Sequence, residues 1–221
     1  MTISLSDAGK RFNREWIFRH FTYTFEEGRS YAITGPNGSG KSTLLQAISG
    51  SMHINEGSIK YELQNTKYET GSLHDGQENQ KSKLPPEEIY NHVSLCAPYL
   101  EVVEEMTLKE FLNFHNGFKP FLQGITTNSI ISSLALEKAS NKQIRYYSSG
   151  MKQRVKLAQC IFSDTAIVLL DEPCTNLDIA GIELYQQLIN DYCKNRLVVV
   201  SSNDEVEYKF CSEKINISSY K

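Results

Sequence analysis

The pattern of apolar and polar positions predicts two kinds of β-strand in this chain. Three short runs are apolar on both faces, which is typical of parallel strands covered by helices. They are Ser30–Thr34, Ala166–Leu170 and Leu197–Ser201. Near the start, apolar and polar residues alternate along Phe21–Phe25, which indicates antiparallel strands with one solvated face. The sequence therefore predicts an α/β fold with a parallel core sheet and an antiparallel β subdomain.

Helical patterns follow the first two apolar runs and fill the middle of the chain. Thr107-Leu108-Lys109-Glu110 is a capping box, so a helix is expected to begin near residue 107. Further helices are expected over Lys41–Ser49 with Gly50 as the C-cap, over Asn128–Glu137, from about Ser149, and over Asp178–Lys194. We therefore expect a single domain. Its core comprises residues 1–97 and 151–221, with a helical subdomain inserted at 98–150.

A polar stretch, Asn65–Lys83, interrupts these patterns. It contains two glycines and a mixture of Gln, Asn and Lys, and it has no apolar periodicity. This composition is typical of an exposed loop or the tip of a long hairpin, and we expect it to be mobile.

Composition and charge exclude several classes of protein. The 221 residues are 40% hydrophobic and carry a formal net charge of -3, so nothing favours a nucleic-acid partner. No apolar run is long enough to span a membrane, and the first residues do not resemble a secretory signal. The five scattered cysteines lack a C-x-x-C pair and favour a reduced cytosol, and the five histidines show no metal-binding spacing.

A complete phosphate-loop motif lies between the first apolar strand and the helix that follows it. It is Gly35-Pro36-Asn37-Gly38-Ser39-Gly40-Lys41-Ser42, followed by Thr43. Its glycines let successive N–H groups point inward as an anion nest, and the helix dipole favours the same phosphates. Lys41 is expected to contact the β- and γ-phosphates, and the Ser42 hydroxyl is expected to bind Mg²⁺. A glycine-rich turn that only joins strand to helix is disfavoured, because both flanks are correct.

An acidic pair follows the second apolar strand. Asp171-Glu172-Pro173 comes directly after Leu170, and parallel strands end at the edge where α/β proteins bind ligands. Asp171 is then placed to hold Mg²⁺, and Glu172 is placed to polarise an attacking water. By themselves, two acids could equally mark a solvated strand end. The phosphate loop favours the catalytic interpretation, because its chemistry needs a carboxylate here.

A second anion site is suggested at another helix start. Ser148-Ser149-Gly150 precedes an amphipathic helix, whose N-terminus is favourable for a phosphate. From the residues alone, an ordinary N-cap on a surface helix is the favoured interpretation.

Taken together, these motifs resemble those of the ATP-binding cassette (ABC) ATPases in order and spacing. The resemblance implies a P-loop NTPase with a RecA-like core, whose cofactors are ATP and Mg²⁺. It also implies that two cassettes meet head to tail around two ATPs. Ser148 and Gly150 would then contact the γ-phosphate bound by the other subunit, and Asn176-Leu177-Asp178 would match the D-loop at that interface. Phe12 best matches the aromatic residue that stacks on adenine, and Trp16 is a second candidate.

The sequence departs from the family pattern at three places. The signature is Tyr147-Ser148-Ser149-Gly150-Met151 instead of Leu-Ser-Gly-Gly-Gln. Ala97 stands where the family has a glutamine that contacts Mg²⁺, and no histidine follows His115 to steady the γ-phosphate. Ser202 is expected to occupy that histidine's position, with Asn203 beside it. Neither side chain can carry the same charge, so we predict Mg-dependent ATP hydrolysis at a reduced rate.

The leading hypothesis from the resemblance is the ATP-binding subunit of an ABC transporter, which drives a separate transmembrane permease. Such a subunit would be cytoplasmic and peripheral on the inner face of the membrane. We expect docking around Pro98–Met106. There, Glu101, Glu104 and Glu105 either contact basic residues of a coupling helix or form a solvated face. Two alternatives stay open, a soluble ABC ATPase unrelated to transport and a regulatory cassette with weak hydrolysis. The short length resembles small cassettes such as those of cytochrome c maturation.

Overall fold

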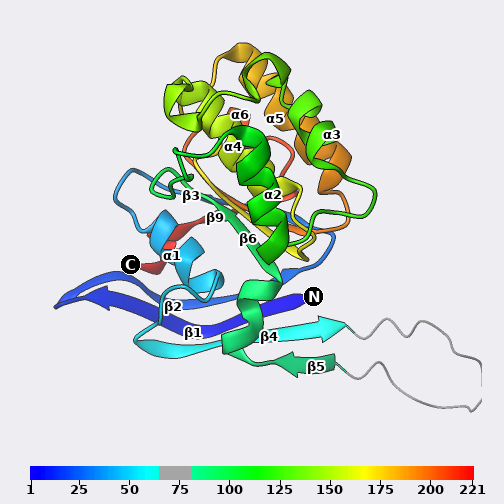
Figure 1. The fold of residues 1–221 in the computed structure, drawn as a ribbon. Helices are drawn as coiled ribbons and strands as arrows, with labels where there is room; N and C mark the ends of the chain where they lie inside the picture. The colour runs from blue at the N-terminus through cyan, green and yellow to red at the C-terminus, as the bar shows by residue number, and fades with distance from the viewer. Residues whose placement is uncertain (65–80) are drawn as a thin grey trace, which may run out of the picture.

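The computed structural model describes residues 1–64 and 81–221. Most of the predicted loop Asn65–Lys83 lies outside the described residues. Its last three residues begin β5 (Lys81–Leu84), which pairs with β4 (Glu56–Gln64). Figure 1 shows the two layers of sheet, with the helical part of the chain on the far side of the core sheet from β1 and β2.

The core sheet has five parallel strands in the order β6-β7-β8-β3-β9. Three of them confirm the strands that the apolar runs predicted: β3 (Ser30–Thr34), β7 (Ile167–Asp171) and β8 (Leu197–Ser201). Every residue of β7 and β8 is buried, as expected for parallel strands covered on both faces. The other two are β6 (Val93–Cys96) and the edge strand β9 (Glu213–Asn216).

The second sheet is antiparallel and has the order β2-β1-β4-β5. The long strands β1 (Thr2–Phe12) and β2 (Glu15–Glu26) form a hairpin, and β4 pairs with the other edge of β1. Helix α1 (Lys41–Ile48) lies between this sheet and the core sheet (Figure 1). The phenylalanines of β2 and the leucines of α1 form one buried cluster there: Phe18, Phe21, Phe25, Leu44 and Leu45. The antiparallel sheet is thus fixed to the helix that follows the phosphate loop.

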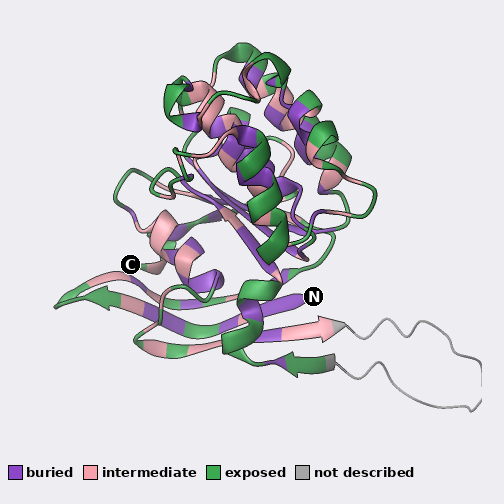
Figure 2. Cartoon of the chain, viewed as in Figure 1, coloured by how far each residue is buried: buried purple, intermediate pink, exposed green. Residues whose placement is uncertain are grey.

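The remaining helices lie on the opposite face of the core sheet. They are α2 (Leu108–Phe118), α3 (Thr127–Ser133), α4 (Ser149–Ile161), α5 (Ile179–Tyr192) and the short α6 (Glu205–Tyr208). Short 3₁₀-helices are η1 (Pro86–Asn91), η2 (Glu137–Ala139), η3 (Ile144–Tyr146) and η4 (Ile217–Tyr220). The apolar side chains of these helices are buried against the core sheet in a second cluster (Figure 2). The subdomain boundaries at 97/98 and 150/151 stay a prediction.

The capping box at the start of α2 is confirmed. The Thr107 hydroxyl accepts a hydrogen bond from the Glu110 N–H, and the Glu110 carboxylate accepts one from the Thr107 N–H at 2.8 Å. The bond from the Thr107 N–H, together with one that the Thr107 hydroxyl donates to the same carboxylate at 2.8 Å, holds the pKa of Glu110 below its usual value. By contrast, α3 ends earlier than the sequence indicates, because Ala135 adopts a left-handed φ of 53° that stops the helix. Among the described residues, no helix combines the length and the apolar character that crossing a membrane requires.

A buried arginine joins α4 to the core sheet, and its loss is expected to destabilise the fold. The Arg196 guanidinium, 8% exposed, donates hydrogen bonds to the carbonyls of Ile161 (2.6 Å), Ser163 (2.9 Å) and Thr165 (2.6 Å). Replacement by methionine would leave these carbonyls without that donor, so Arg196→Met should lower the free energy of unfolding by about 2–4 kcal/mol. Urea unfolding measures the change. The control is the exposed residue Lys194, two positions earlier in the chain. The free energy of unfolding of Lys194→Met should stay within about 0.5 kcal/mol of the wild-type value.

Candidate functional site

Three strands of the core sheet end at the same edge and bring the predicted motifs together. In the register of the sheet, Ser201 of β8 pairs with Ile33 of β3 on one side and with Asp171 of β7 on the other. The phosphate loop follows β3 and the acidic pair ends β7. Two motifs more than 130 residues apart in the sequence are therefore neighbours, as expected at the carboxyl edge of a parallel sheet.

The phosphate loop adopts a backbone that only glycine accommodates easily. Gly35, Gly38 and Gly40 have φ values of 143°, 75° and 104°. At Gly40, which is the N-cap of α1, a Cβ atom would come within 2.4 Å of the Ile17 side chain. Backbone curvature and close packing thus both require glycine, and the N-terminus of α1 opens directly into the loop.

Lys41 is buried beneath this loop. Its side chain is 5% exposed, and Nζ donates hydrogen bonds to the carbonyls of Gly35 (2.9 Å) and Pro36 (3.3 Å). No carboxylate forms an ion pair with it among the residues that the structure describes. A desolvated cation without a counter-charge favours an anionic ligand at the loop.

A cleft of about 230 Å³ opens over the loop and includes one residue of the acidic pair. Glu172 lines it and adopts a left-handed φ of 45°, which turns its backbone away from the strand. The residues that line the cleft are Ile17, Asn37, Gly38, Gly40, Lys41, Ser42, Thr43 and Glu172. The structure thus brings Lys41, Ser42 and Glu172 to one cavity. The predicted residues Gly35, Pro36 and Ser39 belong to the same loop but do not line the cleft.

Three buried oxygens at this edge of the sheet have no hydrogen-bond partner among the described residues. They are Asp171 Oδ1, in a side chain 2% exposed, and the hydroxyls of Ser39 and Ser201. Buried polar atoms are nearly always satisfied, so these three fit a site completed by a ligand. A carboxylate oxygen and the Ser42 hydroxyl are suitable Mg²⁺ ligands when phosphate oxygens supply the rest. The described residues hold no group of three or more His, Cys, Asp or Glu that could bind a metal by themselves.

The end of β8 places Ser202 and Asn203 differently. Ser202 is 2% exposed, and its hydroxyl accepts a hydrogen bond from the Asp204 N–H at 2.9 Å. Asn203 is exposed, and its Nδ2 donates to Asn37 Oδ1 of the phosphate loop at 2.7 Å. Asn203 therefore contacts the phosphate loop, whereas the Ser202 hydroxyl is bonded within its own segment, and neither residue lines the cleft.

The predicted adenine-stacking residues do not line the cleft. Phe12 ends β1, and its ring is 48% exposed with Lys10 Nζ at 5.2 Å from the ring centre. Trp16 lies against the guanidinium groups of Arg11 and Arg19, at 5.5 and 4.5 Å. Both rings thus have a cation against them, and Phe12 is the more exposed of the two residues.

Ile17 of β2 is the hairpin residue that does line the cleft, and the sequence did not single it out. Ala97, at the position of the family glutamine, is fully buried and offers no polar side chain. Nothing in the sequence distinguishes Ile17 from an ordinary apolar residue of a strand.

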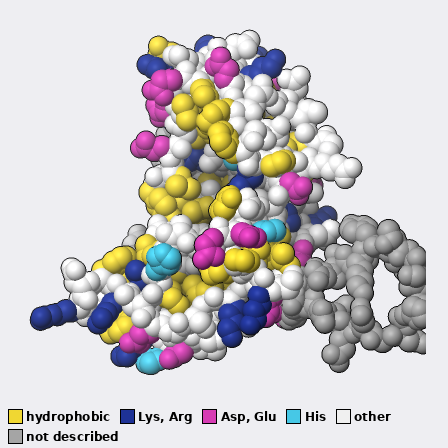
Figure 3. Space-filling view, turned by 60° about the horizontal axis from the view of Figure 1, so that its bottom comes forward, with side chains coloured by type: hydrophobic (Ala, Val, Ile, Leu, Met, Phe, Trp, Pro, Cys, Tyr) yellow, Lys and Arg dark blue, Asp and Glu magenta, His cyan; other side chains and the backbone are white. Residues whose placement is uncertain are grey.

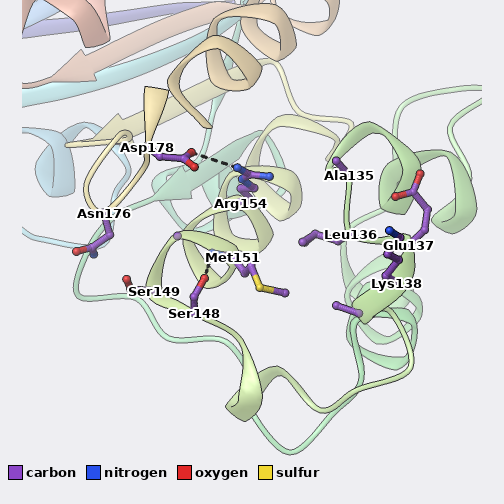
Figure 4. A pocket seen from close by; sticks show the side chains of 12 residues that line it. Ala135, Leu136, Glu137, Lys138, Ser148, Ser149, Met151, Arg154, Asn176 and Asp178 are labelled. Carbon is purple, nitrogen blue, oxygen red and sulfur yellow. Dashed lines mark hydrogen bonds and ion pairs between the residues drawn. The ribbon is translucent and has the colours of Figure 1, made fainter. Parts of the chain in front are cut away.

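A second, larger hollow of about 640 Å³ lies at the start of α4 (Figure 4). Ser148 caps α4 by accepting the Met151 N–H, and Arg154 pairs with Asp178 at 3.3 Å. Across the hollow stands the segment 135–139 that follows α3. A Cβ atom at Gly150 would lie 3.0 Å from the Asn176 carbonyl, so the glycine allows α4 to start against the 176–178 segment. Both predicted residues, Ser148 and Gly150, therefore line a second site separate from the cleft.

Comparison with known proteins gives one consistent result. The family described as ABC transporter matches residues 18–175. The uncharacterized ABC transporter ATP-binding protein YhcH of Bacillus subtilis is 26% identical over 97% of this chain, which spans 66% of that protein's length. Its uncharacterized counterpart YybJ, from the same organism, is 27% identical over 91% of this chain and 85% of its own.

A solved structure has the same fold. The dimeric cassette MJ0796, described as a bacterial ABC transporter cassette, superposes with a TM-score of 0.73 at 21% identity, over 98% of this chain and 95% of its own. A second structure of that cassette, bound to ADP and Pi, has a TM-score of 0.74 at 20% identity, over 98% of this chain and 95% of that one. At these identities the likeness establishes the fold, which is that of an ABC ATPase cassette.

Proposed function

Because the chain belongs to the ABC transporter family, we propose that it is an ATP-binding subunit that hydrolyses ATP to drive a separate transmembrane permease. One observation supports the hydrolysis above all others. A single cleft presents the buried cation Lys41, the Ser42 hydroxyl and the Glu172 carboxylate, with the unpartnered Asp171 oxygen beside it. These are the groups that phosphoryl transfer to water requires.

Each residue of the cleft has a separate task in the proposed reaction. Lys41 and the N–H groups of the loop would bind the phosphates, and Glu172 would orient and polarise the attacking water. Asp171 and Ser42 would hold Mg²⁺, which neutralises charge on the transferred phosphate when bound. Phe12 would stack on the base. Turnover would be reduced, because Asn203 can donate a hydrogen bond to the γ-phosphate but carries no charge.

The second hollow supports head-to-tail pairing of two cassettes. Ser148, Gly150 and the N-terminus of α4 form an anion-favouring surface with no phosphate-binding lysine loop of its own. In a dimer, this surface would face the phosphates bound in the cleft of the other copy. Size-exclusion chromatography with and without Mg-ATP tests the pairing. A species that stays monomeric at saturating ATP would refute it.

The permease is expected to dock beside the helical subdomain. Of the three acids named from the sequence, Glu104 binds Lys152 at 2.5 Å and Glu105 lies 3.7 Å from Arg145. Glu101 is exposed and forms no ion pair with another described residue. Only Glu101 is therefore left for a basic residue of a partner. Figure 3 shows apolar side chains exposed on the upper part of the molecule in that view and at its middle. Tyr90, Phe114 and Phe118 are among the large hydrophobic residues that are exposed.

Two measurements test the proposal against its alternatives. Release of phosphate from Mg-ATP by the purified chain separates an ATPase from a regulatory cassette that only binds nucleotide. Co-purification of a multi-span membrane protein with the tagged chain separates a transporter subunit from a soluble ABC ATPase. Binding without phosphate release would favour the regulatory cassette.

Substitutions at the end of β8 distinguish Asn203 from Ser202. Asn203→Ala should lower kcat about tenfold, since one hydrogen bond toward the transferred phosphate is lost. Ser202→Ala should change kcat by less than about threefold and instead lower stability by about 1 kcal/mol, because its hydroxyl satisfies the Asp204 N–H. Steady-state phosphate release and thermal melting give both numbers. The opposite order in kcat would restore Ser202 as the catalytic candidate.

A further inference from the structure

The turn that carries Glu172 has an unfavourable backbone. Two non-glycine residues of this catalytic turn, defined here as residues 172–177, have left-handed φ values: 45° at Glu172 and 65° at Asn176. Each such conformation costs free energy and persists only where the surroundings enforce it. Inside the turn, the Thr175 hydroxyl donates to the Glu172 carbonyl at 2.8 Å. The backbone adds two bonds, from the Thr175 N–H to the Glu172 carbonyl at 3.2 Å and from the Leu177 N–H to the Cys174 carbonyl at 2.9 Å. None of these three bonds holds the Pro173–Cys174 peptide.

Two buried side chains from other elements supply those contacts. Gln153 of α4, 3% exposed, donates from Nε2 to the Pro173 carbonyl at 2.7 Å. Glu207 of α6, 5% exposed, accepts the Cys174 N–H on Oε1 at 2.8 Å. The carbonyl and the N–H of the Pro173–Cys174 peptide are thereby held from opposite directions.

Glu207 is an unusual residue to find in this place. A buried carboxylate is costly, and burial raises the pKa of Glu207, while the hydrogen bond from the Cys174 N–H opposes the shift. The second carboxylate oxygen, Oε2, is buried and has no hydrogen-bond partner among the described residues. Its own backbone is fixed as well, because the buried Tyr185 hydroxyl donates to the Glu207 carbonyl at 2.8 Å. The carboxylate therefore stands on a rigid support and contacts the catalytic turn through Oε1.

We propose that Glu207 is a positioning residue for the hydrolysis, which holds the catalytic turn so that the Glu172 carboxylate stays in the cleft. The inference rests on the proposed function, since it takes Glu172 as the group that polarises water. Glu207 touches no reacting atom. It acts through the Cys174 N–H, two residues beyond Glu172.

The length of the Glu207 side chain should matter more for turnover than its charge does. Without an acceptor at this point, the Cys174 N–H would be buried and unsatisfied, and the strained turn would relax. A displacement of Glu172 by about 1 Å would lower turnover by up to about 100-fold. Nucleotide affinity should change little, because the phosphate loop is held by other contacts, including those of Lys41.

Three substitutions of Glu207 test the proposal by steady-state ATP hydrolysis, with ATP binding by calorimetry. Glu207→Ala should lower kcat about 10- to 100-fold with KM within about threefold. Glu207→Gln keeps an oxygen that can accept the Cys174 N–H and should retain kcat within about fivefold. Glu207→Asp keeps the charge, but its side chain is one methylene shorter, so kcat should fall about tenfold. The control is Glu205→Ala on the same helix. Glu205 is exposed and pairs with the exposed Lys214 at 2.7 Å, so this variant should match the wild type.

The outcomes separate a positioning role from a structural one and from failure of the proposed function. Wild-type kcat in Glu207→Ala overturns the inference, as does an equal loss of ATP affinity and kcat in that variant. If Glu207→Ala does not fold, the Asp and Gln variants decide: Gln active and Asp impaired supports positioning, and the reverse order overturns it. A wild-type chain that binds Mg-ATP but releases no phosphate refutes hydrolysis and this inference together, whatever the variants do.

Discussion

The substitution Glu172→Gln is expected to lower kcat for ATP hydrolysis by about 10²–10⁴-fold, which is the usual contribution of a positioned general base. The amide is nearly isosteric with the carboxylate but cannot accept a proton from the attacking water. Glu172 lines the cleft without pairing to a cation within the part of the chain that the structure describes. Its neutralisation should therefore disturb no structural ion pair. Phosphate release under saturating Mg-ATP measures the effect.

The affinity for ATP gives the matching control for this substitution. Because the phosphates are bound by the loop rather than by Glu172, calorimetry should give a Kd within about threefold of the wild type. Glu183→Gln, at an exposed position of α5, should leave both kcat and Kd unchanged. If Glu172→Gln kept at least a third of wild-type turnover, Glu172 could not be the group that activates water.

The motifs of the nucleotide site could be predicted from the sequence because each one is local. Gly35–Ser42 is a continuous segment whose glycines, lysine and flanking apolar strand all indicate one structure. The capping box at Thr107 is equally local and is confirmed. Its hydrogen bonds join groups only three residues apart, so it depends little on distant contacts.

The features that the sequence missed depend on contacts between distant elements. Strand β9 is four residues long, and only Ile215 in it is buried, so its pattern is too short to recognise. Ser202 and Asn203 lie where a strand ends, and an error of one position in that end reverses which of the two side chains is expected to face the site. Glu207 follows 30 residues after the turn it holds, in a four-residue helix. Only the folded arrangement shows these relations.

Lys41→Ala is expected to raise the Kd for Mg-ATP by about 10- to 100-fold, which corresponds to the loss of a charged hydrogen-bond donor worth about 1.5–3 kcal/mol. The catalytic loss should be larger, with kcat/KM about 10³-fold lower, because Lys41 also stabilises charge that develops on the transferred phosphate. Its Nζ now binds the carbonyls of Gly35 and Pro36, so the loop also loses an internal support. Calorimetry and phosphate release measure the two effects.

Lys41→Arg separates charge from shape at this position. Arginine keeps the positive charge, but its planar group is larger than an ammonium, and the lysine side chain is only 5% exposed beneath the loop. We therefore expect Lys41→Arg to lose at least about tenfold in ATP affinity. The control, Lys109→Ala at an exposed position of α2, should change the affinity by less than about twofold. Wild-type affinity in both Lys41 variants would show that the phosphates do not bind at this loop, because a compact cation under the glycine turn would then contribute nothing to holding them.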